Sequence, residues 1–363
     1  MPEENIRHMY AGGNTPLGFF SYFKHIISVS HAKRIFIFKG GPGTGKSTLM
    51  RKIGQELSQK GFRVEFIHCS SDNKSLDGIV VPELKIAMMD GTAPHVVDPI
   101  YPGVVDEIIN LGQFWNEKGF QDSREAILSI NKKIKNSFAT AYRYLKAAAS
   151  LKEDTEEVYR EALDKYKEKT LIRELVSDIF RDKKYPDSVG SERCMFASAI
   201  TPRGFSGFLD NLCANMKTIR LSAPSGTCTR SVLESIKNEA LQRGYDIETF
   251  YCSMDPLRIE HLIIPALNTA VITANEYHDV CDVESCSTYL INELYMDKLI
   301  ENHKSRLDFN RTNTEILLQQ AIDSINAAKE AHDELEKYYI RNMDFDALTK
   351  FKDTLIDRIL AYA

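Results

Sequence analysis

Two separate stretches of this chain carry the same pattern of residues, and this repetition constrains the fold more than any other feature. The first stretch begins at Arg7 and reads RHMYA, then TPLGF. The second begins at Arg193, 186 positions later, and reads RCMFA, then TPRGF. Matches in one register over so many positions predict a tandem duplication of a single structural unit.

A second block of matches extends the duplication. Between Gly43 and His95 the identities recur 183 positions later without a gap, and a three-residue insertion or deletion between the blocks accounts for the change of spacing. We therefore expect two domains, residues 1–185 and 186–363. The linker is predicted in the segment DKKYPDSVGSE, 182–192, where Pro, Gly and Ser occur together.

Each copy begins with the same order of predicted elements. A strap that contains the Thr-Pro-x-Gly-Phe turn precedes a strand, a loop, a helix and two further strands. The predicted strands are 35–39, 63–69 and 84–90 in the first copy and 218–222, 246–252 and 267–273 in the second, with helices at 46–60 and 229–243. Strands that alternate with helices are typical of parallel βαβ units.

Both copies then become rich in Glu, Lys, Ala and Leu, with apolar spacings of three and four that predict helices. We expect these helical regions at 103–118, 122–181 and about 284–360. Their length allows a short coiled coil, although regular heptads are not sustained. The predicted fold class is α/β: two tandem three-layer domains with mainly parallel sheets, each followed by a helical region.

A glycine-rich loop follows the first of these strands in the N-terminal copy. It reads GGPGTGKST, and its Gly40-x-x-x-x-Gly45-Lys46-Ser47 spacing is the Walker A, or P-loop, pattern. Glycines let successive N–H groups turn inward around a phosphate, and the following helix directs its positive end at the anion. The residues predicted to bind a nucleoside triphosphate are Gly40, Gly41, Pro42, Gly43, Thr44, Gly45, Lys46, Ser47 and Thr48.

Four side chains in this copy are candidates for chemistry. Ser47 and Asp90 are predicted to hold Mg²⁺, because a hydroxyl follows the loop lysine and an acid ends the apolar run IAMM, as in a Walker B pattern. Lys46 is predicted to reach the β- and γ-phosphates and is the first candidate catalytic residue. Asp72 is the second: it either orients an attacking water or accepts a proton, or it only caps the next turn or helix.

The second copy lacks the side chains that would hold phosphate and metal. Under the 183-residue spacing, the equivalents of Lys46, Ser47 and Asp90 are Thr229, Arg230 and Thr273. Pro224 also removes a backbone N–H from this loop. Because the three side chains disappear together, the loop at 223–231 is predicted to be a pseudo-site. Arg230 is expected to fill the metal position, to bind a free anion or to point across to the first site.

Composition indicates a globular protein. The chain has 363 residues, 43% hydrophobic and 27% charged, which is enough for two cores. Its net charge of −5 gives no general attraction to nucleic acid or to an anionic membrane. No apolar run approaches the roughly 20 residues that span a bilayer, and the N-terminus lacks a signal-peptide pattern, so we expect a cytoplasmic protein. Seven cysteines without a CxxC pair argue against a disulfide framework or a thiolate zinc site.

The first helical region has a basic side, formed by Lys132, Lys133, Lys135, Arg143 and Lys146. This side is either a solvated surface or a lid that contacts phosphates or nucleic acid. The helical regions are also the candidates for binding a protein partner.

From its first predicted strand to Asp90, the N-terminal half resembles P-loop NTPases. The whole chain, including the strap and the segments DGTAPHVVDP and YPGVVDEIINLG, resembles a bacterial family of tandemly duplicated P-loop ATP-binding proteins. This resemblance implies ATP binding and no further activity. The loop APSGTCTRS in the second half departs from the family pattern, since an intact P-loop would be expected there.

The sequence thus predicts a protein that binds ATP with Mg²⁺ at one competent site and hydrolyses it slowly. Gly91 follows Asp90 where fast ATP motors place a glutamate, which disfavours a motor, and no guanine-reading NKxD motif is evident, which favours ATP. Two alternatives remain open. One is a P-loop kinase that transfers the γ-phosphoryl group to a small molecule or nucleotide; the other is a nucleotide-gated module whose helices bind a protein or nucleic acid.

Overall fold

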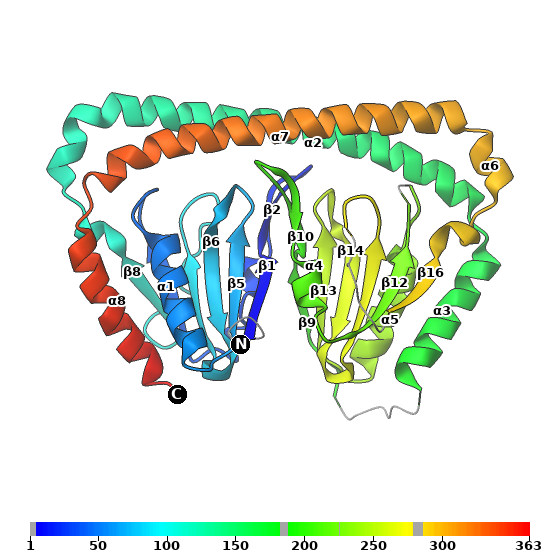
Figure 1. Ribbon diagram of the computed structural model, residues 1–363, viewed down its shortest axis with the longest axis horizontal. Coiled ribbons are helices and arrows are strands. Elements are labelled where there is room, and N and C mark those ends of the chain that lie inside the picture. The colour runs from blue at the N-terminus through cyan, green and yellow to red at the C-terminus, as the bar shows by residue number, and fades with distance from the viewer. Residues whose placement is uncertain (1–4, 182–187, 225, 279–285) are drawn as a thin grey trace.

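Two similar α/β units lie side by side, and two long helices run across one end of both (Figure 1). This arrangement comes from a computed structural model that describes residues 5–181, 188–224, 226–278 and 286–363. Each half contains a six-stranded sheet in which most strands are parallel, followed by helices. The predicted fold class is therefore confirmed. The predicted linker falls partly outside the described residues, since 182–187 are not among them.

The sheet of the first half has the strand order β1-β5-β6-β7-β4-β8. Five strands run in one direction and β6 alone runs against them. The elements are β1 Ile6–Tyr10, β4 Arg34–Lys39, α1 Lys46–Gln59, β5 Val64–Cys69, β6 Asp72–Val81, β7 Ile86–Asp90 and β8 Asp106–Asn110, with a separate hairpin of β2 Gly12–Thr15 and β3 Gly18–Ser21. Buried apolar side chains of β4 alternate between the two faces of the sheet. Phe36 and Phe38 face α1, and Ile35 and Ile37 face the opposite side.

The second half repeats this topology in the order β16-β12-β15-β14-β13-β9, and β14 is its antiparallel strand. Its elements are β9 Glu192–Met195, β10 Ser198–Thr201, β11 Gly204–Gly207, α4 Leu209–Leu212, β12 Lys217–Ser222, α5 Arg230–Gln242, β13 Ile247–Cys252, β14 Asp255–Ile264, β15 Thr269–Ala274 and β16 Cys286–Leu290. Strand for strand, the two sheets correspond. The duplication read from the sequence is thus a duplication of the sheet.

The helical prediction is wrong at two places, because it covers the strands β8 and β16. Residues 103–118 contain β8 and a short 3₁₀ turn, and the region expected to be helical from 284 starts with β16. Both strands lie at the sheet edge and are five residues long, too short for a period of two to be told from a helical spacing. The strands of the two straps (β1 to β3 and β9 to β11) and the ten-residue strands β6 and β14 were also not predicted. β6 begins with four polar residues, and register shifts in the pairing of β6 with β5 and of β14 with β13 break the alternation.

The helices that follow each sheet in the sequence cross over to the other half. Helix α2 (Arg124–Ala162) crosses to the second half, where α3 (Lys165–Phe180) packs with α5 on the second sheet. After the short α6 (Asp297–Glu301), α7 (Lys304–Ile340) returns alongside α2, and α8 (Phe345–Leu360) packs with α1 on the first sheet (Figure 1). The last helix of the chain therefore completes the core of the first half.

The inner faces of the two sheets share one core. Buried side chains from β4 and β7 join those of β14 and β15, with the 3₁₀ turn Phe23–His25 and α4 between them. Tyr10 and Phe196, which occupy equivalent positions, exchange two backbone hydrogen bonds of 2.9 Å. The two halves are therefore packed into one body around a local two-fold relation.

A cluster of four charged side chains lies at this junction. Arg7 lies 3.1 Å from Glu65 and 2.5 Å from Glu248, while Arg193 lies 2.6 Å from Glu65 and 3.3 Å from Glu248. Each arginine therefore bridges the acids of both halves. Burial would raise the pKa of Glu248, but Arg7 and Arg193 hold it below its ordinary value.

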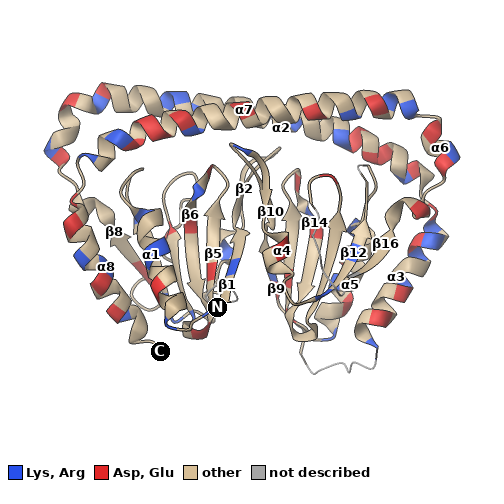
Figure 2. Ribbon diagram, in the orientation of Figure 1, with Lys and Arg blue, Asp and Glu red and all other residues tan. Residues whose placement is uncertain are grey.

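Acidic and basic residues are interspersed along the outer helices (Figure 2). Such interspersed charge is typical of a solvated helix surface. Among the described residues, no helix is both long and apolar enough to span a membrane.

Candidate functional site

The glycine-rich loop, residues 40–48, connects the end of β4 to the start of α1. Gly43 and Gly45 have φ of 68° and 85°, conformations that side chains other than glycine rarely adopt. Gly45 is the N-cap of α1, and no acidic residue occupies the first turn of this helix. The positive end of the α1 dipole is therefore not neutralised by its own sequence, which makes the loop electropositive.

Lys46 is held over this loop. Its ammonium group donates to the backbone oxygens of Gly40 and Gly41, both at 2.8 Å, and the side chain is largely buried. Asp90 Oδ2 lies 3.5 Å from Lys46 Nζ. Asp90 reaches this position because β7 pairs with β4, which places it opposite Phe38. Two predicted site residues, 44 positions apart in sequence, are thus brought together.

Ser47 and Asp72 lie on a second side of the loop. Ser47 Oγ accepts a hydrogen bond from Leu76 N at 2.9 Å. Asp72 accepts from Lys74 N at 2.9 Å and from Ser75 Oγ at 2.8 Å, so it caps the turn that carries Leu76. Burial would raise the pKa of Asp72, but these hydrogen bonds and a nearby lysine lower it, so the carboxyl group stays charged.

That lysine is Lys329, whose Nζ lies 3.3 Å from Asp72 Oδ2. It belongs to α7 and therefore comes from the second half of the chain. The sequence analysis missed it, because 257 residues separate it from Asp72 and nothing in its local pattern distinguishes it from other helix-surface lysines.

Helices α7 and α8 press directly on the loop glycines. A Cβ at Gly41 would meet the Tyr339 ring at 2.4 Å, and one at Gly45 would meet Leu348 at 2.9 Å. A Cβ at Gly43 would lie 3.0 Å from the backbone oxygen of Glu336. These glycines therefore serve close helix packing as well as loop conformation, a constraint that the sequence pattern alone does not reveal.

The remaining predicted loop residues are arranged as follows. Thr44 is buried and donates its hydroxyl to Gly41 O at 2.8 Å. Pro42 is half-buried, and Thr48 is exposed on the first turn of α1.

A buried acid–histidine pair lies behind Asp90. His95 Nε2 is 3.3 Å from Asp77 Oδ1, and its ring stacks on Phe23. Burial by itself would lower the pKa of His95, but Asp77 and Asp90 raise it above its ordinary value. The second half has the same pair, His278 and Glu260, at 3.2 Å. Each half thus places its histidine beside a buried acid, which is consistent with the predicted structural role of these histidines.

The ionic contact between Lys46 and Asp90 in the first half is replaced by a neutral contact in the second half. Thr229 and Thr273 share a hydrogen bond of 2.7 Å at the positions of Lys46 and Asp90. Arg230 lies 3.4 Å from Asp255 of its own half. Of the three alternatives for Arg230, the one in which it points across to the first site is wrong, because Arg230 lies near Asp255 and Glu234 of the second half.

Residues 21–80 match the family model described as Nephrocystin 3, N-terminal. The matched segment contains β4, the glycine-rich loop, α1, β5 and most of β6. It covers less than a fifth of the chain, so the match describes the first half only. No solved structure matches the chain.

Proposed function

We propose that this chain is a cytoplasmic, Mg²⁺-dependent ATP-binding protein of the P-loop NTPase superfamily that hydrolyses ATP slowly. The observation that carries the proposal is the position of Lys46, held on the loop carbonyls at the N-terminus of α1 and 3.5 Å from Asp90. A triphosphate would take the lysine from these carbonyls, and Mg²⁺ would lie between its phosphates, Ser47 and Asp90.

Slow turnover follows from what surrounds this loop. Asp90 is followed by Gly91, and Asp72 is already engaged by Lys74, Ser75 and Lys329. Neither position therefore offers a free carboxylate for activating water.

Titration with a non-hydrolysable ATP analogue, followed by measurement of phosphate release from ATP, tests the proposal. Binding with slow release to water supports the ATPase. Transfer of phosphate to an added nucleotide or small-molecule acceptor would instead favour a kinase, and tight binding without turnover would favour a nucleotide-gated module. Absence of binding would overturn the proposal.

Asp90→Asn is expected to lower the stimulation of the hydrolysis rate by Mg²⁺ about tenfold or more, while the affinity for metal-free nucleotide changes little. Asparagine still accepts a hydrogen bond from Thr92, but it removes the negative charge that Mg²⁺ requires. Turnover measured across a Mg²⁺ titration checks this. Asp98→Asn, at an exposed acid that pairs with Lys39, is the matched control. Equal effects on metal dependence and on metal-free binding would make Asp90 a structural residue.

One nucleotide is expected to bind per chain. The second loop has neither the lysine nor the paired acid, and its Thr227 and Cys228 N–H groups are bonded to Pro224 O and the Tyr295 hydroxyl. Equilibrium titration with an ATP analogue should therefore saturate near one equivalent. A second equivalent that persists in Lys46→Ala would show that the second half also binds nucleotide.

A further inference from the structure

A cavity of about 430 Å³ lies at the carboxyl end of β8, the strand that pairs with β4. One side is formed by residues 113–116, which include the end of the 3₁₀ turn Leu111–Phe114. The other side is formed by residues 341–344 and Ala347, where α7 passes into α8. β4 and β8 are parallel, so the cavity lies at the same edge of the sheet as the glycine-rich loop, where ligands of open α/β sheets bind.

Two side chains connect this cavity to the glycine-rich loop. The Tyr339 ring would meet a Cβ at Gly41 at 2.4 Å, and its centroid lies 6.0 Å from that of the Trp115 ring. Leu111 Cβ lies 3.4 Å from the position of a Cβ at Gly40. Trp115 and the loop therefore lie against the same ring, so a nucleotide whose phosphates occupy the loop has its base within reach of the cavity.

The cavity combines an aromatic ring with free amide groups. Trp115 is half-buried in its lining, together with the half-buried Met343. The side-chain amides of Gln113 and Asn116 also line it and form no hydrogen bond with a described residue. An aromatic ring stacks on any nucleobase, and an amide offers both a donor and an acceptor. These groups suit a flat heterocycle that carries donors and acceptors side by side.

Arg341 and Asp344, the charged residues of the described lining, are already engaged. Arg341 donates to Ser123 Oγ, and its guanidinium lies 4.8 Å from the centroid of the Tyr338 ring. Asp344 caps α8 by accepting from Ala347 N at 2.9 Å. An arginine reads the two acceptors of guanine, whereas an asparagine or glutamine amide pairs with the neighbouring donor and acceptor of adenine. The free groups therefore favour adenine.

The second half provides a comparison for this lining. Trp115 pairs with Met343 in an isolated β-bridge, and Tyr295 pairs with Leu163 in the same way. The members of the two bridges are 180 positions apart in both cases. This spacing identifies the residues of the second half that correspond to the cavity lining.

At the corresponding positions the amides are absent. Glu293 occupies the position of Gln113, and Met296 occupies that of Asn116. The amides are therefore present in the half with the intact phosphate-binding pattern and absent from the half whose loop is degenerate, as expected if they serve the same ligand.

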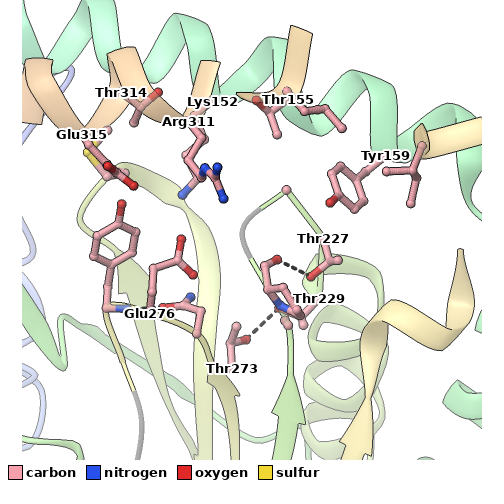
Figure 3. A pocket seen from close by; sticks show the side chains of 18 of the residues that line it. Lys152, Thr155, Tyr159, Thr227, Thr229, Thr273, Glu276, Arg311, Thr314 and Glu315 are labelled. Atoms are coloured by element: carbon pink, nitrogen blue, oxygen red, sulfur yellow. Dashed lines mark hydrogen bonds between the residues drawn. The ribbon is translucent and has the colours of Figure 1, made fainter. Parts of the chain in front are cut away.

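The degenerate loop borders a different cavity, of about 540 Å³, between the loop and helices α2 and α7 (Figure 3). Thr229 and Thr273, which replace Lys46 and Asp90, are in its lining. Met296 is not among its lining residues. This cavity therefore corresponds to the phosphate side of the first site and not to the cavity after β8.

We propose that the cavity formed by residues 113–116, 341–344 and Ala347 binds the adenine base of the nucleotide. The indole of Trp115 would stack on the base, and the amides of Gln113 and Asn116 would bond to its N6 amino group and ring nitrogens. The inference rests on the proposed binding of ATP at residues 40–48 and adds the determinants of base specificity.

Replacement of both amides tests the inference by calorimetric titration. Gln113→Ala/Asn116→Ala is expected to weaken binding of a non-hydrolysable ATP analogue about tenfold or more, because a bidentate contact to the base is lost. Tripolyphosphate, which has no base, should bind this variant as it binds the wild type. Gln320→Ala/Asn302→Ala removes two exposed amides outside the cavity and should change neither affinity.

Trp115 gives a second readout, since it is the only tryptophan of the chain. Stacking of the base should quench its fluorescence with the same midpoint as the calorimetric titration. The ATP analogue should also bind the wild type about tenfold more tightly than the matching GTP analogue, because the amides pair with adenine. This preference should disappear in Gln113→Ala/Asn116→Ala.

Four results would each overturn the inference while leaving the proposed ATP site intact. They are unchanged Trp115 fluorescence at saturating ATP analogue, equal affinity of wild type and Gln113→Ala/Asn116→Ala for this analogue, equal affinity of the wild type for the ATP and GTP analogues, and loss of tripolyphosphate binding in the double variant, which would make the amides supports of the loop. If neither the ATP analogue nor tripolyphosphate binds the wild type, the phosphate site itself is wrong and the inference falls with it.

Discussion

Lys46→Ala is expected to lower the affinity for an ATP analogue, or the rate of hydrolysis, by about a hundredfold or more, while the protein still folds. In the structure Lys46 bonds to carbonyl groups of its own loop, and these interactions are exchanged for phosphate when a nucleotide binds. Removal of one charged donor from a preorganised phosphate site has an effect of about this size. Calorimetric titration and phosphate release measure the two quantities separately.

The control for this variant is Lys52→Ala, an exposed lysine on the same helix. It changes net charge equally without touching the loop, so both measurements should match the wild type. Thermal unfolding of Lys46→Ala separates a loss of function from a loss of fold. If a folded Lys46→Ala variant binds and turns over ATP as the wild type does, the assignment of the first loop is wrong.

Glu248→Gln is expected to lower the free energy of unfolding by about 3 kcal/mol or more. The side chain is mostly buried between Arg7 and Arg193, and an isosteric amide leaves these two guanidinium groups with one acid instead of two. Because the cluster joins both halves, the loss should appear in the unfolding of the whole chain. Urea denaturation followed by circular dichroism measures it.

Glu83→Gln provides a matched comparison, since its ion pair with Arg63 is equally short at 2.5 Å but exposed. Its expected cost is at most about 1 kcal/mol, because solvent screens the pair. A cost for Glu248→Gln no larger than that of Glu83→Gln would contradict the view that the cluster stabilises the junction.

The stability lost in Glu248→Gln is expected to depend on pH. The pKa of Glu248 in the folded protein lies below its ordinary value of 4.5, so its contribution to stability is present above that value and is lost as pH falls through the folded pKa. The difference in stability between wild type and Glu248→Gln should therefore shrink on acidification. A difference that is constant from neutral to acidic pH would argue against a charged Glu248.

Local sequence was sufficient for the repeated parts of this protein. The strands at 35–39 and 63–69, the helix at 46–60 and their equivalents follow from periodicity and from the glycine-rich loop, because these signals lie within a few residues of each other. Comparison of the two copies also located the candidate chemistry, since Lys46 and Asp90 are found together while their equivalents are two threonines that bond to each other.

Short edge strands and the paths of the helices were not accessible in this way. β8 and β16 are defined by their pairing with β4 and β12, not by their own composition. The helical regions were recognised, but the amphipathic pattern of α3 or α8 states only that one face is buried, not on which sheet.

By itself, the sequence determined that the chain holds two copies of one α/β unit and that one copy has a lysine, a serine and an acid where the other has none. Only the tertiary structure decided that α8 completes the first half, that Lys329 meets Asp72, and that the degenerate loop borders a cavity. The physical reason is the distance along the chain. A pattern reports neighbours within one or two turns, whereas these contacts join residues up to hundreds of positions apart, and the packing of α2 against α7 brings them together.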